Sequence, residues 1–160
     1  MKSQRVNVSV PCGLFVSILA IFFISGNVIS QKITDVRIVK AFKGFDIVSY
    51  NQLEKPAKGV DEFTFHYKDL KFKFISAENR ELFKSDPDKY LPQYGGNCAY
   101  GIALSGNHFW GNPKSYEIYD GKLYFFFKRS FLDYRKKWLK NGADSLRLKA
   151  DENWHKQVKG

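Results

Sequence analysis

The chain has 160 residues and a formal net charge of +10, with 44% apolar and 17% aromatic residues. This length suits one domain and is too short for two domains of ordinary size. A disulfide scaffold is also excluded, because only one of the two cysteines, Cys98, lies outside the N-terminal segment. The core must therefore be built from apolar packing, for which 15 Phe, 9 Tyr and 3 Trp supply large side chains.

The first 30 residues have the pattern of a secretory signal peptide. Lys2 and Arg5 provide a short basic start, and residues 12–24 are almost continuously apolar. The segment ends on Ser30, a small residue that suits a cleavage site. We therefore predict a leader over residues 1–30 that directs export to the periplasm or to the outside of the cell.

Cleavage after the leader leaves residues 31–160 as a single mature domain. The alternative is an uncleaved membrane anchor through residues 11–29, although its apolar core is short for a segment that needs about 20 apolar residues to span a bilayer. The predicted mature part carries 24 basic and 16 acidic residues. Such a balance suits anionic lipid, anionic glycan or nucleic acid, and export argues against nucleic acid as the partner.

The first half of the mature domain is predicted to begin with strands. Residues 36–42 alternate apolar and basic side chains, which favours an edge strand, and residues 51–59 form a polar loop. Aromatic residues alternate with other side chains over residues 62–67 and 71–75. We expect these two segments to pair as a hairpin, because the connection over residues 68–70 is short.

Two helix starts follow the hairpin. Ser76 is a good N-cap for a helix over residues 77–84, because its side chain can accept a hydrogen bond from a free N–H of the first turn. Asp86 followed by Pro87 starts a second short helix, since aspartate also caps and proline fits the first helical turn. Pro92 ends that helix.

The second half of the domain mixes irregular, strand and helical patterns. Residues 94–111 are rich in glycine and are predicted to be irregular, whereas residues 116–119 and 122–127 form a hairpin around an Asp-Gly turn. Residues 130–140 and 143–157 are predicted helices with an Asn-Gly C-cap between them. The expected fold class is α+β: a small single domain of short antiparallel hairpins with several helices.

Several separated motifs resemble, in the same order, those of the larger bacterial YHS-domain proteins. The family motifs are a Gly-Tyr-Asp-Pro-Val-Ala-Tyr opening, a Ser-Ala-Glu-Asn-Arg helix start, a Phe-x-x-Asp-Pro-x-x-Tyr element, a Tyr-Gly-Gly-x-Cys-Ala-Tyr-Gly turn and an Asp-Gly-Lys-Leu-Tyr hairpin. Residues 44–50 are similar to the opening, with Ile47 in place of its proline, and residues 76–80, 83–90, 94–101 and 120–124 match the other four motifs. The resemblance runs from about Ala41 to Trp154, and it implies an exported binding module whose ligand is undefined.

One departure limits what the resemblance implies about metals. Short metal-binding members of the wider superfamily carry a Phe-Cys-Ser-x-x-Cys arrangement, in which two thiolates can hold one soft metal ion. In this chain Ile75 and Asn79 stand at the two cysteine positions. The paired-cysteine metal site is therefore not carried over.

Cys98 is the first candidate for chemistry, because it is the only cysteine of the predicted mature chain. Glycines on both sides permit a tight backbone turn there. The functional interpretations are a soft-metal ligand, a redox thiol or a nucleophile, and the simpler interpretation is a small buried residue. We name Cys98, Tyr94, Tyr100 and His108 as the expected ligand-binding residues.

A metal site would use Cys98 and His108, which lie ten positions apart. Copper or zinc are the expected metals for a thiolate and an imidazole. Against this prediction, no histidine pair has ligand spacing such as His-x-x-x-His, and no methionine remains after the leader. The simpler interpretation makes His108 an exposed loop residue.

We favour a non-enzymatic protein and assign no catalytic residue, but a thiol enzyme or redox protein using Cys98 is one alternative. A cysteine hydrolase could use Cys98, His108 and either Asn107 or Asn112, although no pattern places the thiol at a helix N-terminus. A homodimer through an intermolecular disulfide of Cys98 is another alternative for an exported chain.

The last alternative is an interaction domain that uses a basic helix. Lysine and arginine are frequent over residues 128–140, and apolar residues recur there at intervals of three and four. This pattern is typical of helices that contact an anionic membrane surface. It is also typical of an ordinary helix with one face on the core and one basic face in solvent.

Overall fold

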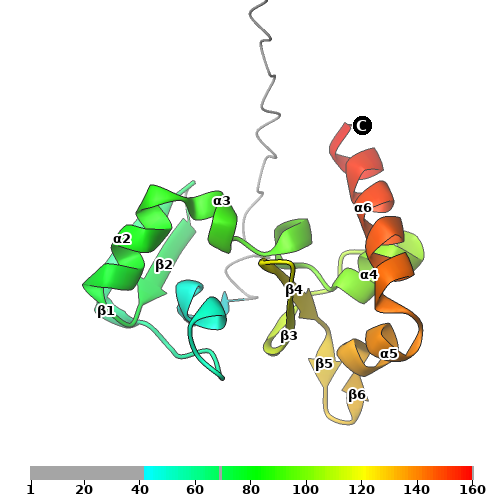
Figure 1. The fold of residues 1–160 in the computed structure, drawn as a ribbon, viewed down its shortest axis with the longest axis horizontal. Coiled ribbons are helices and arrows are strands. Elements are labelled where there is room, and N and C mark those ends of the chain that lie inside the picture. The colour runs from blue at the N-terminus through cyan, green and yellow to red at the C-terminus, as the bar shows by residue number, and fades with distance from the viewer. Residues whose placement is uncertain (1–41, 69, 160) are drawn as a thin grey trace, which may run out of the picture. The chain divides into compact units, whose positions relative to one another are not determined.

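The computed structural model describes residues 42–68 and 70–159 (Figure 1). This part of the chain combines short antiparallel strand pairs with helices, which confirms the predicted α+β class. In chain order its elements are η1 (Val48–Asn51), β1 (Val60–Tyr67), β2 (Leu70–Phe74), α2 (Ala77–Ser85), α3 (Pro87–Tyr90), η2 (Gln93–Gly96), α4 (Ala99–Ser105), β3 (Asn112–Tyr119), β4 (Lys122–Phe126), β5 (Lys128–Arg129), β6 (Leu132–Asp133), α5 (Tyr134–Lys140) and α6 (Ala143–Lys159). The predicted leader and most of the predicted edge strand lie outside the described residues.

The buried apolar side chains form two clusters. The first cluster contains Phe42, Ile47, Val48, Tyr50, Leu70, Phe72, Phe74, Phe83, Tyr90, Leu91, Leu123 and Phe125. The second cluster contains Tyr94, Cys98, Ala99, Tyr100, Ile102, Ala103, Tyr124, Phe126, Trp138, Leu146 and Ala150. The elements up to α3 therefore pack mainly on the first cluster, and η2, α4, α5 and α6 pack on the second.

The β1–β2 hairpin confirms the first predicted strand pair. Leu70, Phe72 and Phe74 are buried on one face of β2, while Lys71 between them is exposed. The ring of Phe83 on α2 lies 4.7 Å from the ring of Phe72, measured between centroids. The alternation read from the sequence therefore identifies the face of the hairpin on which α2 packs.

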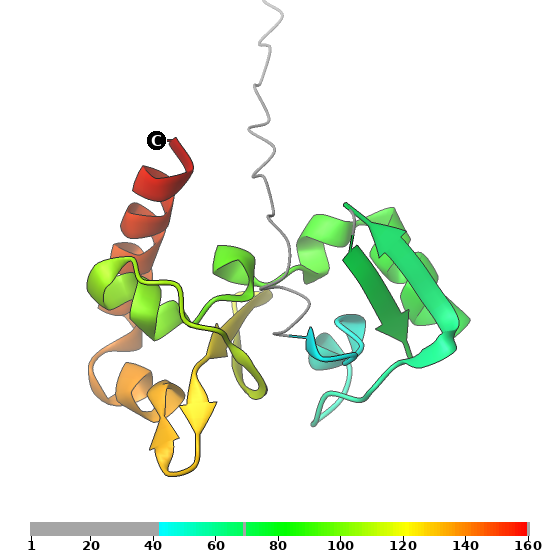
Figure 2. The same ribbon diagram turned by 180° about the vertical axis from the view of Figure 1, so that it is seen from behind.

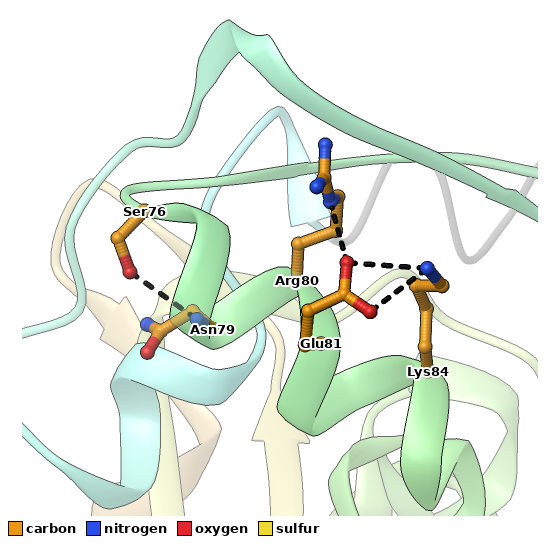
Figure 3. A network of polar contacts seen from close by, with 5 residues as sticks. All are labelled: Ser76, Asn79, Arg80, Glu81 and Lys84. Carbon is orange, nitrogen blue, oxygen red and sulfur yellow. Dashed lines mark hydrogen bonds and ion pairs between the residues drawn. The ribbon is translucent and has the colours of Figure 1, made fainter.

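Helix α2 begins as the sequence predicts (Figure 3). The Ser76 hydroxyl accepts a hydrogen bond from the backbone N–H of Asn79 at 3.2 Å. On the exposed side of the helix, Glu81 pairs with Arg80 at 3.1 Å and with Lys84 at 2.8 Å. Exposed ion pairs of this kind add little stability, so the cap and the buried side hold the helix. The second predicted helix is the short α3, capped by an aspartate before its first proline.

Strand β4 contributes side chains to both clusters. It pairs with β3 through the predicted turn at residues 120–121, which confirms the second hairpin. Successive side chains of a strand point to opposite faces. Leu123 and Phe125 accordingly belong to the first cluster, and Tyr124 and Phe126 belong to the second. The two clusters therefore lie on opposite faces of β4.

Residues 94–111 are not irregular throughout, so that prediction is wrong. Helix α4 occupies part of the segment and ends at Gly106, whose φ of 67° lies in the left-handed region. All of residues 99–103 are buried, so no polar face marks the helix in the sequence. Figures 1 and 2 show α4 beside α6, and the Asn153 side chain of α6 donates to the Ile102 carbonyl at 2.9 Å.

The predicted helix over residues 130–140 is correct only in its second half. Its first residues belong instead to the short β5–β6 hairpin, and α5 begins at Tyr134. The Asp133 carboxylate caps α5 by accepting the N–H of Arg135 at 3.1 Å. The predicted final helix is confirmed as α6.

Candidate functional site

Cys98 is the N-cap residue of α4 and is fully buried in the second cluster. Its backbone N–H donates to the carbonyl of Phe109 at 2.7 Å, and the residue also forms a parallel bridge with Phe125. Sequence analysis did not place the thiol at a helix N-terminus, and that interpretation is wrong. The missing signal was α4 itself, which has no amphipathic pattern.

The surroundings of the thiol favour its protonated form. Burial raises the pKa of the Cys98 thiol, and the backbone N–H groups of Phe127, Gly101 and Tyr100 act in the opposite direction. The negative charge of Asp133 adds to the increase. The resulting pKa lies above the usual value of a thiol. Because the thiolate is the form that attacks electrophiles and binds metals, this environment suits packing better than reactivity.

Tyr94 and Tyr100, both predicted ligand-binding residues, use their hydroxyl groups to hold the helices in place. Tyr94 has a φ of 56°, and its hydroxyl donates to Asp151 of α6 at 2.8 Å. The hydroxyl of Tyr100 accepts a hydrogen bond from the Asn141 side chain at 2.8 Å. Both rings are buried. These contacts connect η2 and α4 to the C-terminal helices.

His108 is exposed and interacts with α6. Its Nε2 lies 2.7 Å from the side-chain oxygen of Gln157, and its ring lies 5.6 Å from the ring of Trp154. No hydrogen bond joins this ring to the Cys98 thiol in the described part of the chain. Within the same residues, no group of three or more His, Cys, Asp and Glu side chains could hold a metal ion. Copper or zinc binding at Cys98 and His108 therefore stays a prediction from the sequence.

Sequence analysis missed a buried carboxylate. Asp46 is fully buried, and its Oδ1 accepts the backbone N–H groups of Val48 at 2.8 Å and Ser49 at 3.3 Å. Its Oδ2 accepts the N–H of Ile75 at 2.9 Å and the side-chain amide of Asn79 at 2.7 Å. The carboxylate thus ties η1 to the junction between β2 and α2. The available signal was an aspartate inside the otherwise apolar Phe-Asp-Ile-Val run.

The two residues that distinguish this chain from paired-cysteine proteins both contact that carboxylate. Ile75 and Asn79 occupy the positions that carry cysteine in the metal-binding arrangement. Here the backbone N–H of Ile75 and the side-chain amide of Asn79 both donate to Asp46. A hydrogen-bonded carboxylate with no thiolate is a structural anchor at this junction, because each oxygen already has two donors.

A groove of about 470 Å³ opens between β3 and α5. It is lined by Tyr50, Lys114, Tyr116, Glu117, Ile118 and Arg135. The rings of Tyr50 and Tyr116 meet edge-on at 4.9 Å between centroids. In the part of the chain that the structure describes, neither Lys114 nor Arg135 pairs with a carboxylate. Sequence analysis did not identify this groove, because residues far apart in the chain line it.

The segment Lys128–Lys140, comprising β5, β6 and α5, is called the basic arm below. It contains six basic residues and one acidic residue. That acid, Asp133, already accepts a hydrogen bond from Ser115 at 2.9 Å and pairs with Lys128 at 3.1 Å. The exposed cations that make no ion pair with any described residue are Arg129, Arg135, Lys136, Lys137 and Lys140. Most of the positive charge of the arm is therefore not neutralised within the described fold.

One buried side chain of the arm attaches it to the domain. Trp138 is fully buried, and its Nε1 donates to the Glu117 carboxylate at 3.0 Å. The same carboxylate pairs with the largely buried Arg147 of α6 at 2.8 Å. The Arg147 guanidinium lies 3.5 Å from the ring centroid of Tyr119. At the other end of the arm, Phe131 is 97% exposed.

Comparisons with protein-family models, curated proteins and solved structures find no match to this chain. The resemblance to YHS-domain proteins therefore stays a prediction from the quoted motifs. No helix among residues 42–68 and 70–159 is long and apolar enough to cross a membrane.

Proposed function

We propose that this chain is an exported, non-enzymatic binding module that engages an anionic surface through the basic arm. The observation that carries the proposal is the set of exposed, unpaired cations on the arm, whose one acid is already satisfied by Ser115 and Lys128. Unneutralised charge on one segment attracts a surface of the opposite sign and increases the rate of encounter with it. Export through residues 1–30 and membership of the YHS-domain family are parts of this proposal and rest on the sequence.

The structure gives less support to the alternatives at Cys98. Full burial and a raised pKa disfavour a thiol enzyme, a redox thiol and an intermolecular disulfide, since each requires an accessible thiol or thiolate. The predicted ligand-binding residues Tyr94 and Tyr100 also have their hydroxyl groups occupied by Asp151 and Asn141. The arm, in contrast, gathers five exposed cations that make no ion pair with any described residue.

The test compares two double charge reversals that change the net charge equally. Both hydrophobic clusters lie within residues 42–154, so residues 31–160 contain the described core and can be tested without the leader. Arg129→Glu with Lys136→Glu alters the arm. Lys55→Glu with Lys122→Glu is the matched control, since both lysines are exposed and lie outside it.

We expect wild type and the control to be retained on immobilised heparin, a soluble polyanion, at low ionic strength. The arm variant should elute at clearly lower salt than the control, because opposite charges attract most strongly where cations cluster. Equal elution of the two variants would show that only net charge matters. Failure of the wild type to bind would reject the proposal outright.

A second candidate function is small-ligand binding in the groove between β3 and α5. The supporting observation is that Lys114 and Arg135 line the groove with two tyrosines and make no ion pair with a described residue, whereas Glu117, the acid in the lining, pairs with Arg147. This arrangement suits a small anionic aromatic compound. Screening such compounds by protein-observed NMR should perturb groove resonances in wild type and not in Lys114→Ala. If none of the compounds shifts the groove resonances of wild type, small-ligand binding in the groove is excluded.

A further inference from the structure

The turn between β5 and β6 presents an aromatic side chain at its end. Arg129 pairs with Leu132, so only Ser130 and Phe131 form the connection. Ser130 has a φ of 49°, in the left-handed region that a tight two-residue turn requires. Phe131 is 97% exposed and is the most exposed large apolar residue of the described chain. In both ribbon views the turn projects from the adjoining elements (Figures 1 and 2).

An exposed apolar side chain is not unusual by itself, because much of any protein surface is apolar. Phe131 differs from the other exposed apolar residues in its setting. It lies at a turn, and Arg129, Arg135 and Lys136 follow or precede it within five residues without ion pairs in the described structure. Polymers such as glycans offer anionic groups and no apolar phase. A bilayer offers both, with phosphate-rich headgroups above hydrocarbon.

We propose that the anionic surface is a lipid bilayer and that Phe131 inserts into it while the cations of the basic arm contact its headgroups. This inference rests on the proposed function and adds the identity of the partner. A ring at a hairpin tip can enter the interfacial region without unfolding any element, because almost none of the surface of Phe131 is used in packing. Lysine and arginine side chains beside it can extend to the phosphates.

The test uses residues 31–160 and vesicles of neutral phosphatidylcholine, with or without an anionic lipid such as phosphatidylglycerol. Wild type should bind the anionic vesicles, with affinity that decreases as salt rises. Phe131→Ser should weaken that binding at least about tenfold, because apolar transfer is lost. Leu148→Ser is the matched control: Leu148 is 72% exposed on α6, outside the arm, and its change should leave vesicle binding unaltered. Heparin binding of Phe131→Ser should equal that of wild type.

Insertion depth has its own readout. Phe131→Trp should gain fluorescence that is quenched by brominated lipid acyl chains, beyond the quenching seen in wild type with its native tryptophans. Unchanged vesicle binding by Phe131→Ser, or no additional quenching in Phe131→Trp, would overturn insertion and leave the proposed function standing. Binding to heparin without binding to anionic vesicles would also overturn the bilayer as partner. Binding to neither would reject both proposals.

Discussion

Two segments of equal length show opposite uses of their side chains. Residues 93–105, which contain η2, Cys98 and α4, carry the residue types that suggest chemistry, and most of them are buried. The basic arm carries ordinary surface residues, and only Trp138 among them is buried. The thiol and tyrosines of the first segment are used in packing and in holding helices. What is left available for recognition lies on the second segment.

Trp138 is the one side chain of the arm that is buried in the domain, so removing it should have the largest effect. Trp138→Ala should lower the free energy of unfolding by about 3–5 kcal/mol, because a fully buried aromatic side chain leaves a large cavity. Leu139→Ala, next to it and half-exposed, should cost less than about 1 kcal/mol. Urea denaturation followed by circular dichroism measures both. Similar losses in the two variants would mean that the arm is not attached through Trp138.

The ion pair behind Trp138 should give the next largest effect. Glu117→Gln removes one charged partner of Arg147 and should lower the free energy of unfolding by about 2–3 kcal/mol. Breaking a buried ion pair usually costs more, but Arg147 keeps its second partner, Asp144. The control is Glu81→Gln, whose ion pairs are exposed and should contribute less than about 1 kcal/mol. Denaturation curves for the two variants provide the comparison. Equal free energies of unfolding for the two variants would show that the buried ion pair contributes no more stability than an exposed one.

Burial of Cys98 predicts a pH dependence. Since folding raises the pKa of this thiol, its contribution to stability is complete below the ordinary thiol pKa of about 8.5 and decreases above it, as the unfolded thiol ionises. The difference in unfolding free energy between wild type and Cys98→Ala should therefore change by up to about 1.4 kcal/mol per pH unit above that value. Unfolding measured between pH 7 and pH 10 tests this. A constant difference would indicate an accessible thiol.

The smallest effect on stability is expected where the largest effect on binding is expected. Phe131→Ser should change the free energy of unfolding by less than about 0.5 kcal/mol, because its side chain is 97% exposed. Thermal unfolding monitored by circular dichroism is sufficient. A loss above about 1 kcal/mol would show that Phe131 packs within the domain, so that the basic arm, like residues 93–105, would use its side chains in packing.

The sequence predicted well where a pattern has a local cause. Alternating aromatics and short turns predicted both hairpins, and Ser76 predicted the start of α2. It failed at α4, whose buried faces show no periodicity, and at residues 128–133, where apolar spacing was taken for helix although the segment turns. The Asp46 anchor was also missed, because its partners lie 29 and 33 positions away in the chain. Long-range contacts of polar groups have no local signature.

Strand β4 has a consequence for how the domain unfolds. Four of its five residues supply side chains, two to each cluster, so exposing either cluster to water also exposes part of the other. The two halves should therefore behave as one cooperative unit, and native-state hydrogen exchange should find the amides of β4 among the slowest to exchange. A turn outside both clusters, such as the β5–β6 turn, can then move or bind a partner without unfolding the two clusters.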